Sequence, residues 1–157
     1  MHPIEVVGVR VEMPSNQPIV LVKELDGPRY LPIWVGAVEA TAIAFAQQGV
    51  VPPRPLTHDL LASILEATAQ TLVKVFLTEI RDGIFYSELH FQGDIVISAR
   101  PSDALALAIR LGTPIFASEE LLSSAGVEIP EDSTNPEEEV ERFKEFLDHI
   151  NPEDFAG

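Results

Sequence analysis

The chain has 157 residues, of which 46% are hydrophobic, and its formal net charge is -15. This length fits one domain with a substantial core. No apolar run approaches the roughly 20 residues that a membrane-spanning helix needs. The absence of cysteine excludes disulfides, thiolate metal sites and cysteine nucleophiles, and it is typical of a cytoplasmic protein. We therefore expect a cytoplasmic protein that makes no membrane contact.

The negative charge is concentrated near the end of the chain. Residues 119–157 contain 13 acidic and 2 basic side chains, a net charge of -11, whereas residues 1–118 contain 12 and 8, a net charge of -4. An acidic tail is usually a solvated surface. No basic patch interleaved with aromatic residues occurs, so we expect any contact with nucleic acid to be weak and non-specific.

The first part of the chain predicts an antiparallel meander of three strands. Valine-rich or alternating segments indicate strands at residues 4–13, 19–25 and 29–35. Asp26-Gly27 is a tight-turn signal between two apolar runs. A helix is predicted next, over residues 36–48. It is apolar almost all round, so we expect it to be buried on most sides.

The second part repeats this plan with more helices. A proline-rich connector leads to an amphipathic helix at residues 58–69, for which Thr57 is the expected cap. The next elements, in chain order, are predicted as strands 71–80, 84–91 and 95–99, helix 101–111, strand 114–117 and a helix opened by Ser118.

These elements predict an α+β fold, with antiparallel-rich sheet and packed helices in a single compact domain. We place this domain at residues 1–130. Residues 131–157 are predicted to be an acidic linker followed by a charged helix at 136–149. Two strand clusters, each followed by a helix-start motif, are consistent with an internal duplication.

Two helix starts share one pattern: an arginine, a proline, a hydroxyl residue and an acid. The segments are Arg54-Pro55-Leu56-Thr57-His58-Asp59 and Arg100-Pro101-Ser102-Asp103. The acid suits the positive end of the helix dipole, but the arginine does not. An arginine at this position usually needs an anion, which is either a carboxylate of the protein or a phosphate of a ligand.

The acids near these motifs have a structural and a functional interpretation. Asp59, Asp103 and Glu39 could pair with arginines as structural ion pairs, which is the more common role. Alternatively, the three carboxylates could together hold Mg²⁺ or Mn²⁺, ions that prefer oxygen ligands and assist phosphodiester cleavage. No pattern for an organic cofactor is present.

The remaining motif residues have the same two interpretations. His58 either packs at the edge of the helix or acts as a general acid or base, because imidazole titrates near neutral pH. Arg54 and Arg100 either pair with the protein's own acids or bind phosphate.

Several of these segments together resemble the bifunctional nuclease domain family, which is also known as a domain of unknown function. The resemblance spans roughly residues 4–130. The segments that carry it are Leu31-Pro32-Ile33-Trp34-Val35-Gly36, Glu39-Ala40, Arg54 to Leu61, Phe85-Tyr86 and Arg100 to Ala108. The resemblance implies an α+β domain of bacterial and plant proteins, with nuclease activity on DNA and RNA in some members. It points to the motif positions Glu39, Arg54, His58, Asp59, Arg100 and Asp103.

Our main hypothesis is a low-specificity, metal-assisted nuclease that hydrolyses phosphodiester bonds of DNA and RNA. In it, His58, Asp59 and Asp103 are catalytic, Arg54 and Arg100 bind phosphate, and Glu39, Asp59 and Asp103 hold the metal.

The alternative hypothesis is a non-catalytic binding or regulatory module, in which the same residues form a structural ion network. Family members often have an aspartate where this chain has Ser98, which favours the module. A sensor of small anions is a third hypothesis. We also predict a homo-oligomer, with a dimer favoured, because edge strands rich in valine and isoleucine can pair across a two-fold axis.

Overall fold

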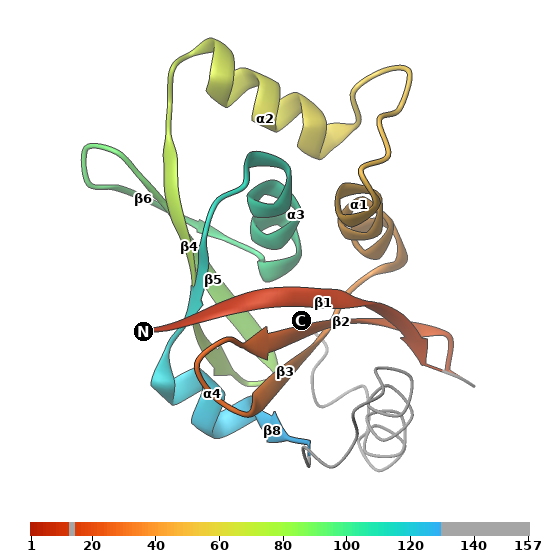
Figure 1. The fold of residues 1–157 in the computed structure, drawn as a ribbon, viewed down its shortest axis with the longest axis vertical. Coiled ribbons are helices and arrows are strands. Elements are labelled where there is room, and N and C mark those ends of the chain that lie inside the picture. Colours follow the sequence, from red (N-terminus) through yellow and green to blue (C-terminus); the bar gives the residue numbers. More distant parts are fainter. Residues whose placement is uncertain (13–14, 130–157) are drawn as a thin grey trace.

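In the described residues, two three-stranded meanders, a short strand that joins them and a two-residue strand at one end form one eight-stranded sheet. The computed structural model describes residues 1–12 and 15–129, and Figure 1 shows their arrangement. The first meander is β1 (His2–Glu12), β2 (Gln17–Glu24) and β3 (Arg29–Trp34). The second is β4 (Leu72–Arg81), β5 (Ile84–Phe91) and β6 (Ile95–Ala99). The predicted α+β fold is thus confirmed.

The short strand β7 (Ile115–Ala117) joins the two meanders. It pairs antiparallel with β1, where His2 lies opposite Ala117. It pairs parallel with β4, where Val75 lies opposite Ile115. Together with the two-residue strand β8 (Val127–Glu128), this gives the order β6-β5-β4-β7-β1-β2-β3-β8.

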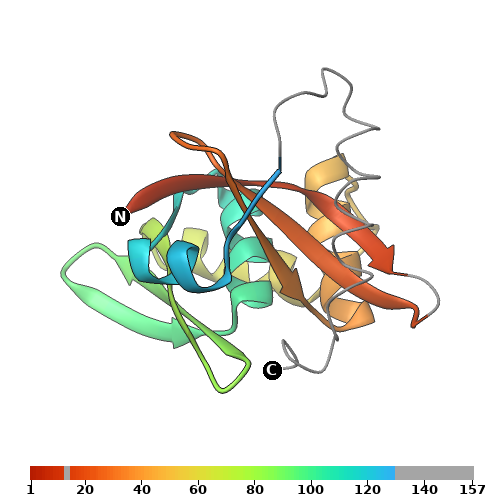
Figure 2. The same cartoon turned by 90° about the horizontal axis from the view of Figure 1, so that it is seen from below.

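Four helices accompany the sheet in the described part of the chain. They are α1 (Ala37–Gln48), α2 (Thr57–Ala67), α3 (Pro101–Leu111) and α4 (Glu119–Ala125). Helices α1 and α3 lie side by side against the sheet, and α2 crosses the end of α3 (Figures 1 and 2). The consecutive residues Ala104–Ala108 of α3 are completely or almost completely buried. Helix α3 is therefore the centre of the hydrophobic core.

Helix α1 is much less buried than the sequence predicts. Ala40 and Ile43 are its buried residues, whereas Val38 is 81% exposed. Its apolar composition results largely from alanine, whose small side chain is tolerated on both faces of a helix. The prediction that α1 is buried on most sides is wrong for the isolated chain, since α1 lies at the margin of the helix layer.

The helix caps also differ from those predicted. Helix α2 has Leu56 as its N-cap residue and α3 has Arg100, so neither Thr57 nor Ser102 is a cap. In α3, Pro101 occupies the first helical position, which proline favours because its fixed φ suits the helix and its missing N–H is not needed there. By contrast, Ser118 caps α4 as predicted, and its hydroxyl accepts a hydrogen bond from the Leu121 N–H at 3.0 Å.

A network of ions ties the first meander to α4. Glu24, which is only 4% exposed, accepts hydrogen bonds from Nε and Nη2 of Arg29 at 2.9 and 3.0 Å. The same guanidinium donates to both carboxylate oxygens of Glu119. His2 Nε2 lies 2.7 Å from Glu119 Oε2. One arginine therefore neutralises two acids from different elements.

No helix within residues 1–12 and 15–129 is long and apolar enough to cross a membrane. The acidic linker and terminal helix predicted at 131–157 lie outside the described residues.

Candidate functional site

Three helix starts each carry one of the carboxylates that the sequence analysis singled out. Glu39 in α1, Asp59 in α2 and Asp103 in α3 are each the third residue after the N-cap. A negative charge in the first turn of a helix is stabilised by the helix dipole. The shared position therefore gives these acids a structural reason to be present, whatever chemistry they also support.

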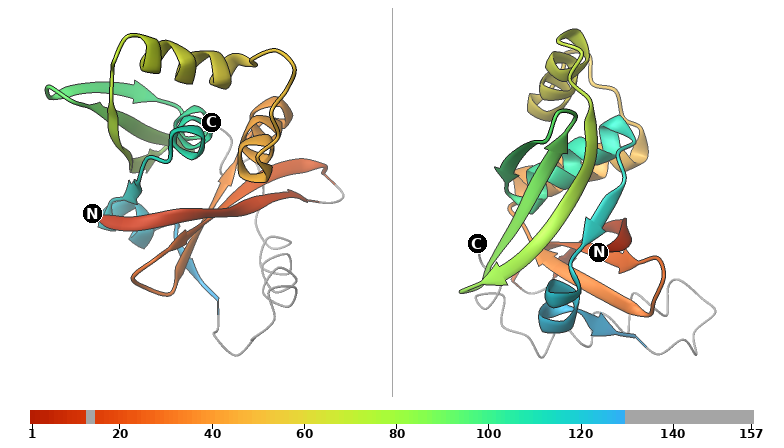
Figure 3. Two further views of the ribbon diagram at one scale, coloured as in Figure 1. Left: turned by 45° about the horizontal axis from the view of Figure 1, so that its top comes forward. Right: turned by 90° about the vertical axis from the view of Figure 1, so that its left-hand side faces the viewer.

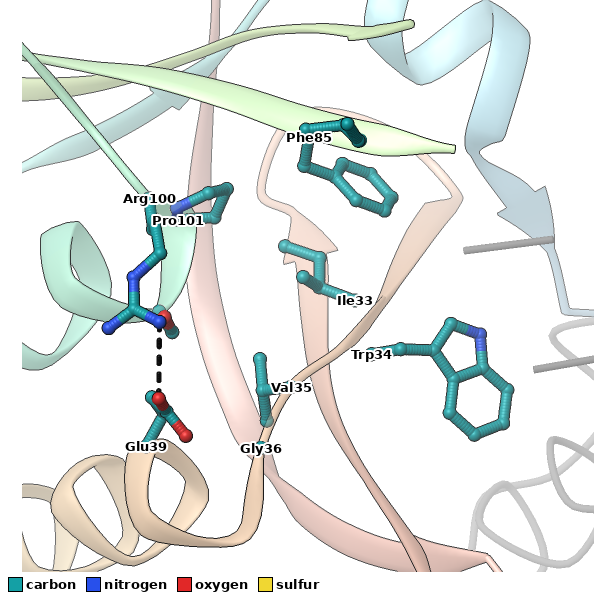
Figure 4. Close-up of a pocket in the computed structure, with 10 residues that line it drawn as sticks. Ile33, Trp34, Val35, Gly36, Glu39, Phe85, Arg100 and Pro101 are labelled. Carbon is teal, nitrogen blue, oxygen red and sulfur yellow. Dashed lines mark hydrogen bonds and ion pairs between the residues drawn. The ribbon is translucent and has the colours of Figure 1, made fainter. Parts of the chain in front are cut away.

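Arg100 connects two of these acids. Its Nε donates to Asp103 Oδ2 at 2.9 Å and its Nη2 donates to Asp103 Oδ1 at 3.2 Å. Its Nη1 donates to Glu39 Oε1 at 3.1 Å, so the guanidinium lies between α1 and α3 (Figure 4). The Arg100 side chain nevertheless remains 63% exposed. Because each terminal nitrogen carries a second proton, Arg100 can also receive an anion from solvent.

His58 joins the same network from α2. Its Nε2 lies 2.9 Å from Asp103 Oδ1, and its side chain is only 13% exposed. A carboxylate that holds one ring nitrogen fixes the orientation of the imidazole and leaves the other nitrogen for proton exchange. The structure therefore brings His58, Asp103, Arg100 and Glu39 into one connected group.

Asp59 belongs to a second, separate pair. Its Oδ1 accepts a hydrogen bond from Arg110 Nε at 2.7 Å, and its Oδ2 accepts one from the Leu56 N–H at 3.1 Å. Arg110 is only 9% exposed and also donates to the carbonyl oxygens of Ala42 and Ala106. Arg110 is not among the site residues predicted from the sequence. Arg110 follows Asp103 by seven residues, which is two helical turns, so both side chains lie on the face of α3 that meets α2. This spacing is the sequence signal that could have identified Arg110 as a partner for an acid of α2.

Arg54 lies away from both groups. Its side chain is exposed in the connector before α2, and it makes no hydrogen bond or ion pair with the residues that the structure describes. It is therefore a cation that is available to an external anion.

A small cavity adjoins Arg100. It has a volume of about 80 Å³ and is lined mainly by apolar side chains, among them Ile33, Val35 and Pro101 (Figure 4). Known small-molecule sites have volumes of roughly 300–1,000 Å³, so this cavity is too small to enclose a nucleotide. Trp34 points away from Arg100 (Figure 4).

The arrangement of the acids can be compared with what a divalent cation needs. Within residues 1–12 and 15–129, the one group of three His or acidic residues with converging ligand atoms is His2, Glu24 and Asp26, far along the sheet from α2. Between Glu39 and Asp103, the guanidinium of Arg100 occupies the position that a cation would take. In this arrangement Glu39, Asp59 and Asp103 do not fit a shared Mg²⁺ or Mn²⁺. Metal binding by these three acids remains a prediction from the sequence.

The ion pairs change the acidity of two carboxyls. The hydrogen bond from Arg110 holds the pKa of Asp59 below its usual range. Burial alone would raise the pKa of Asp103, but hydrogen bonds from Arg100 and His58 outweigh burial and lower it. Both groups are therefore ionised at neutral pH.

We expect acid to destabilise the start of α2 through these carboxyls. A carboxyl whose pKa is lower in the folded state stabilises the fold above its unfolded pKa, and this contribution is lost as pH falls through the folded pKa. The melting temperature, measured by circular dichroism from pH 6 to pH 2, should fall more steeply below roughly pH 4. Asp59→Asn should start lower and fall less steeply. Glu66→Gln, which changes an exposed acid of the same helix, should follow the wild type, and equal slopes for Asp59→Asn and wild type would contradict the assignment.

The fold and this group define an α+β domain in which ion pairs link the first turns of three helices. A sequence profile of the bifunctional nuclease domain matches residues 20–130. Two uncharacterized proteins of Mycobacterium tuberculosis, from strains CDC 1551 / Oshkosh and ATCC 25618 / H37Rv, are each 50% identical to this chain over 163 residues. The similarity covers 100% of this chain and 99% of each relative. The chain belongs to the bifunctional nuclease domain family, as the resemblance in its sequence indicated.

Proposed function

We propose that this protein is a low-specificity nuclease whose site is formed by His58, Asp103 and Arg100. The observation that carries the proposal is the connected series in which Asp103 holds both the imidazole of His58 and the exposed guanidinium of Arg100. This places a group that can move protons beside a group that can bind phosphate. Membership of the bifunctional nuclease domain family supports the same class of substrate.

In this proposal the residues divide the work of phosphodiester hydrolysis. Arg100 binds the oxygens of the reacting phosphate and stabilises the charge that grows on them, and Arg54 binds another phosphate of the same strand. The free nitrogen of His58 accepts a proton from the attacking water as its oxygen forms a bond to phosphorus. The P–O ester bond breaks, and the leaving oxygen takes up a proton from solvent water. Asp103 orients His58, while Asp59 and Glu39 position α2 and Arg100.

The decisive experiment measures cleavage of single-stranded DNA and of RNA by wild type and His58→Ala. We expect His58→Ala to reduce the rate by roughly 10²–10⁴-fold, the usual contribution of general acid–base catalysis. His90→Ala is the matched control, because His90 also lies 3.1 Å from a carboxylate, that of Glu88, but on β5 outside the site. The assay is run with EDTA and with Mn²⁺, so that the metal predicted from the sequence is tested separately.

The second candidate is the non-catalytic binding or regulatory module. It is favoured by the pairing of each helix-start acid with an arginine, which leaves Glu39, Asp59 and Asp103 with structural partners. Equal rates for His58→Ala and wild type, or no cleavage by either, would support this candidate. Binding of labelled single strands would then weaken in Arg54→Ala without any loss of thermal stability, because Arg54 holds no other residue of the described chain.

A further inference from the structure

Strand β6 forms one end of the sheet, and no strand within residues 1–12 and 15–129 pairs with its outer backbone edge. Three consecutive residues on it, Ile95, Val96 and Ile97, are 47%, 49% and 49% exposed. Natural sheets usually protect such an edge with charges, proline or a bulge, because a free edge is a template for another strand. No residue of β6 carries a charge, so this edge has no protection of that kind.

The pairing of β6 with β5 shows which face its side chains occupy. Ile95 and Ile97 lie opposite Phe91 and Leu89, which are buried. Opposed residues in an antiparallel pair share one face of the sheet. Ile95 and Ile97 therefore lie on the face that the helices cover, at a margin that the helices do not reach.

Helix α2 extends this apolar margin. Asp59 and Ser63 line the groove between α2 and α1, so the opposite flank of α2 faces away from α1. That flank carries Leu61 and Ile64, which are 37% and 48% exposed. In Figures 1 and 3, α2 lies above the β5–β6 hairpin. Both α2 and β6 thus carry exposed apolar side chains.

We propose that a second copy of this chain pairs with the β6 edge across a two-fold axis. The uncharged β6 edge suits a second copy of the chain, because a two-fold axis sets each surface against itself. Two copies that each carry a net charge of -15 repel one another, and the repulsion is weakest where the surfaces in contact carry no charge, as on β6. The joined β6 strands form one continuous sheet through both copies, and the α2 helices lie on the same side of it.

The register follows from the residues at the two ends of β6. Ile97 is the midpoint of the strand Ile95–Ala99, so a two-fold axis there sets Ile97 opposite Ile97. Residue 94 of one copy then lies opposite residue 100 of the other. Asp94 therefore meets Arg100 of the second copy, and opposite charges rather than like charges flank the joined strands. This contact would also bring the second copy beside the Arg100 group described above.

The absence of cysteine from the whole chain allows a sharp test of this register. Opposed residues of an antiparallel pair have Cα atoms roughly 4.5–5.5 Å apart, within the range that a disulfide spans. Under mild oxidation, Ile97→Cys should form a covalent dimer on a non-reducing gel. Val7→Cys is the control, since Val7 is exposed to a similar degree, 42%, but lies on β1. The control should remain a monomer on the same gel.

Light scattering supplies the second measurement. Wild type should have twice the chain mass of 17.2 kDa at micromolar concentration, and Ile97→Lys should be a folded monomer by circular dichroism. A monomeric wild type would overturn the proposal. So would a dimer that persists in Ile97→Lys and is not cross-linked through Ile97→Cys, because the contact would then use another surface. Neither result depends on nuclease activity.

Discussion

Arg29→Ala should lower the free energy of unfolding by about 3 kcal/mol, as expected when one partner of a buried ion pair is removed. Glu24 is almost fully buried and receives two hydrogen bonds from this guanidinium. Removal of Arg29 leaves that carboxylate charged and largely unsolvated, with the imidazole of His2, 3.5 Å away, as its remaining nearby partner. Urea denaturation measures the change. The matched control is Arg81→Ala, whose exposed guanidinium pairs with Glu79 at 3.5 Å and should change the stability much less than Arg29→Ala does.

A double variant separates the loss of the pair from the presence of an unpaired charge. Arg29→Met combined with Glu24→Leu removes both charges and keeps apolar volume, so it should recover much of the stability lost in Arg29→Ala. If the double variant is no more stable than the single one, the cost comes from the lost contacts of Arg29 with Glu119 instead. A loss below about 1 kcal/mol in Arg29→Ala would contradict the burial argument itself.

Arg110→Ala should lower the free energy of unfolding by about 1.5–3 kcal/mol, the range for hydrogen bonds that involve a charged group. Arg110 holds α2 through Asp59 and holds α1 through the carbonyl of Ala42. Within α2 itself, only Ala62 is buried, so this helix depends on few apolar contacts. Its amide protons, at residues 57–67, should therefore exchange faster in the variant.

Arg110→Lys gives the control for that prediction. Lysine keeps the charge near Asp59 but lacks the planar group that reaches three acceptors at once. We expect the stability of Arg110→Lys to lie between that of wild type and that of Arg110→Ala. If amide exchange at residues 57–67 is unchanged in Arg110→Ala, Arg110 does not hold α2 in place.

The sequence allowed the elements of the second meander to be predicted closely. The predicted ranges 84–91, 95–99 and 101–111 coincide with β5, β6 and α3. Their ends are marked by local signals: Asp82-Gly83 and Gly93-Asp94 form turns with positive φ, and Gly112 ends α3 in the left-handed conformation. Turn and helix-end signals depend only on residues that are close in sequence, so they can be recognised without tertiary structure.

Contacts between distant segments were not predictable in the same way. The two meanders were expected as separate clusters, because nothing local shows that Ile115–Ala117 pairs with both β1 and β4. The exposure of α1 was missed for a related reason. Its composition shows that it can be buried, but only the packed structure shows how much neighbouring surface is available to bury it.

The candidate site shows the same limit. The pairing of Arg100 with Asp103 lies within one helix turn, and it was one of the alternatives weighed from the sequence. The contacts of Asp103 with His58 and of Arg110 with Asp59 span 45 and 51 residues. Residue types and positions in the predicted helices identified the candidate site residues. Which of these residues pair with one another depends on how α2 crosses α3 in the folded protein.

The position of β7 has a consequence for the order of folding during synthesis. The pairs that complete the sheet join His2 to Ala117, so they close a loop that includes most of the described chain. Such distant pairings form late and slowly, because a long loop must lose conformational entropy before the new contacts stabilise it. On the ribosome, the first meander must wait with one side of β1 unpaired until β7 emerges, and it is then open to pairing with other nascent chains.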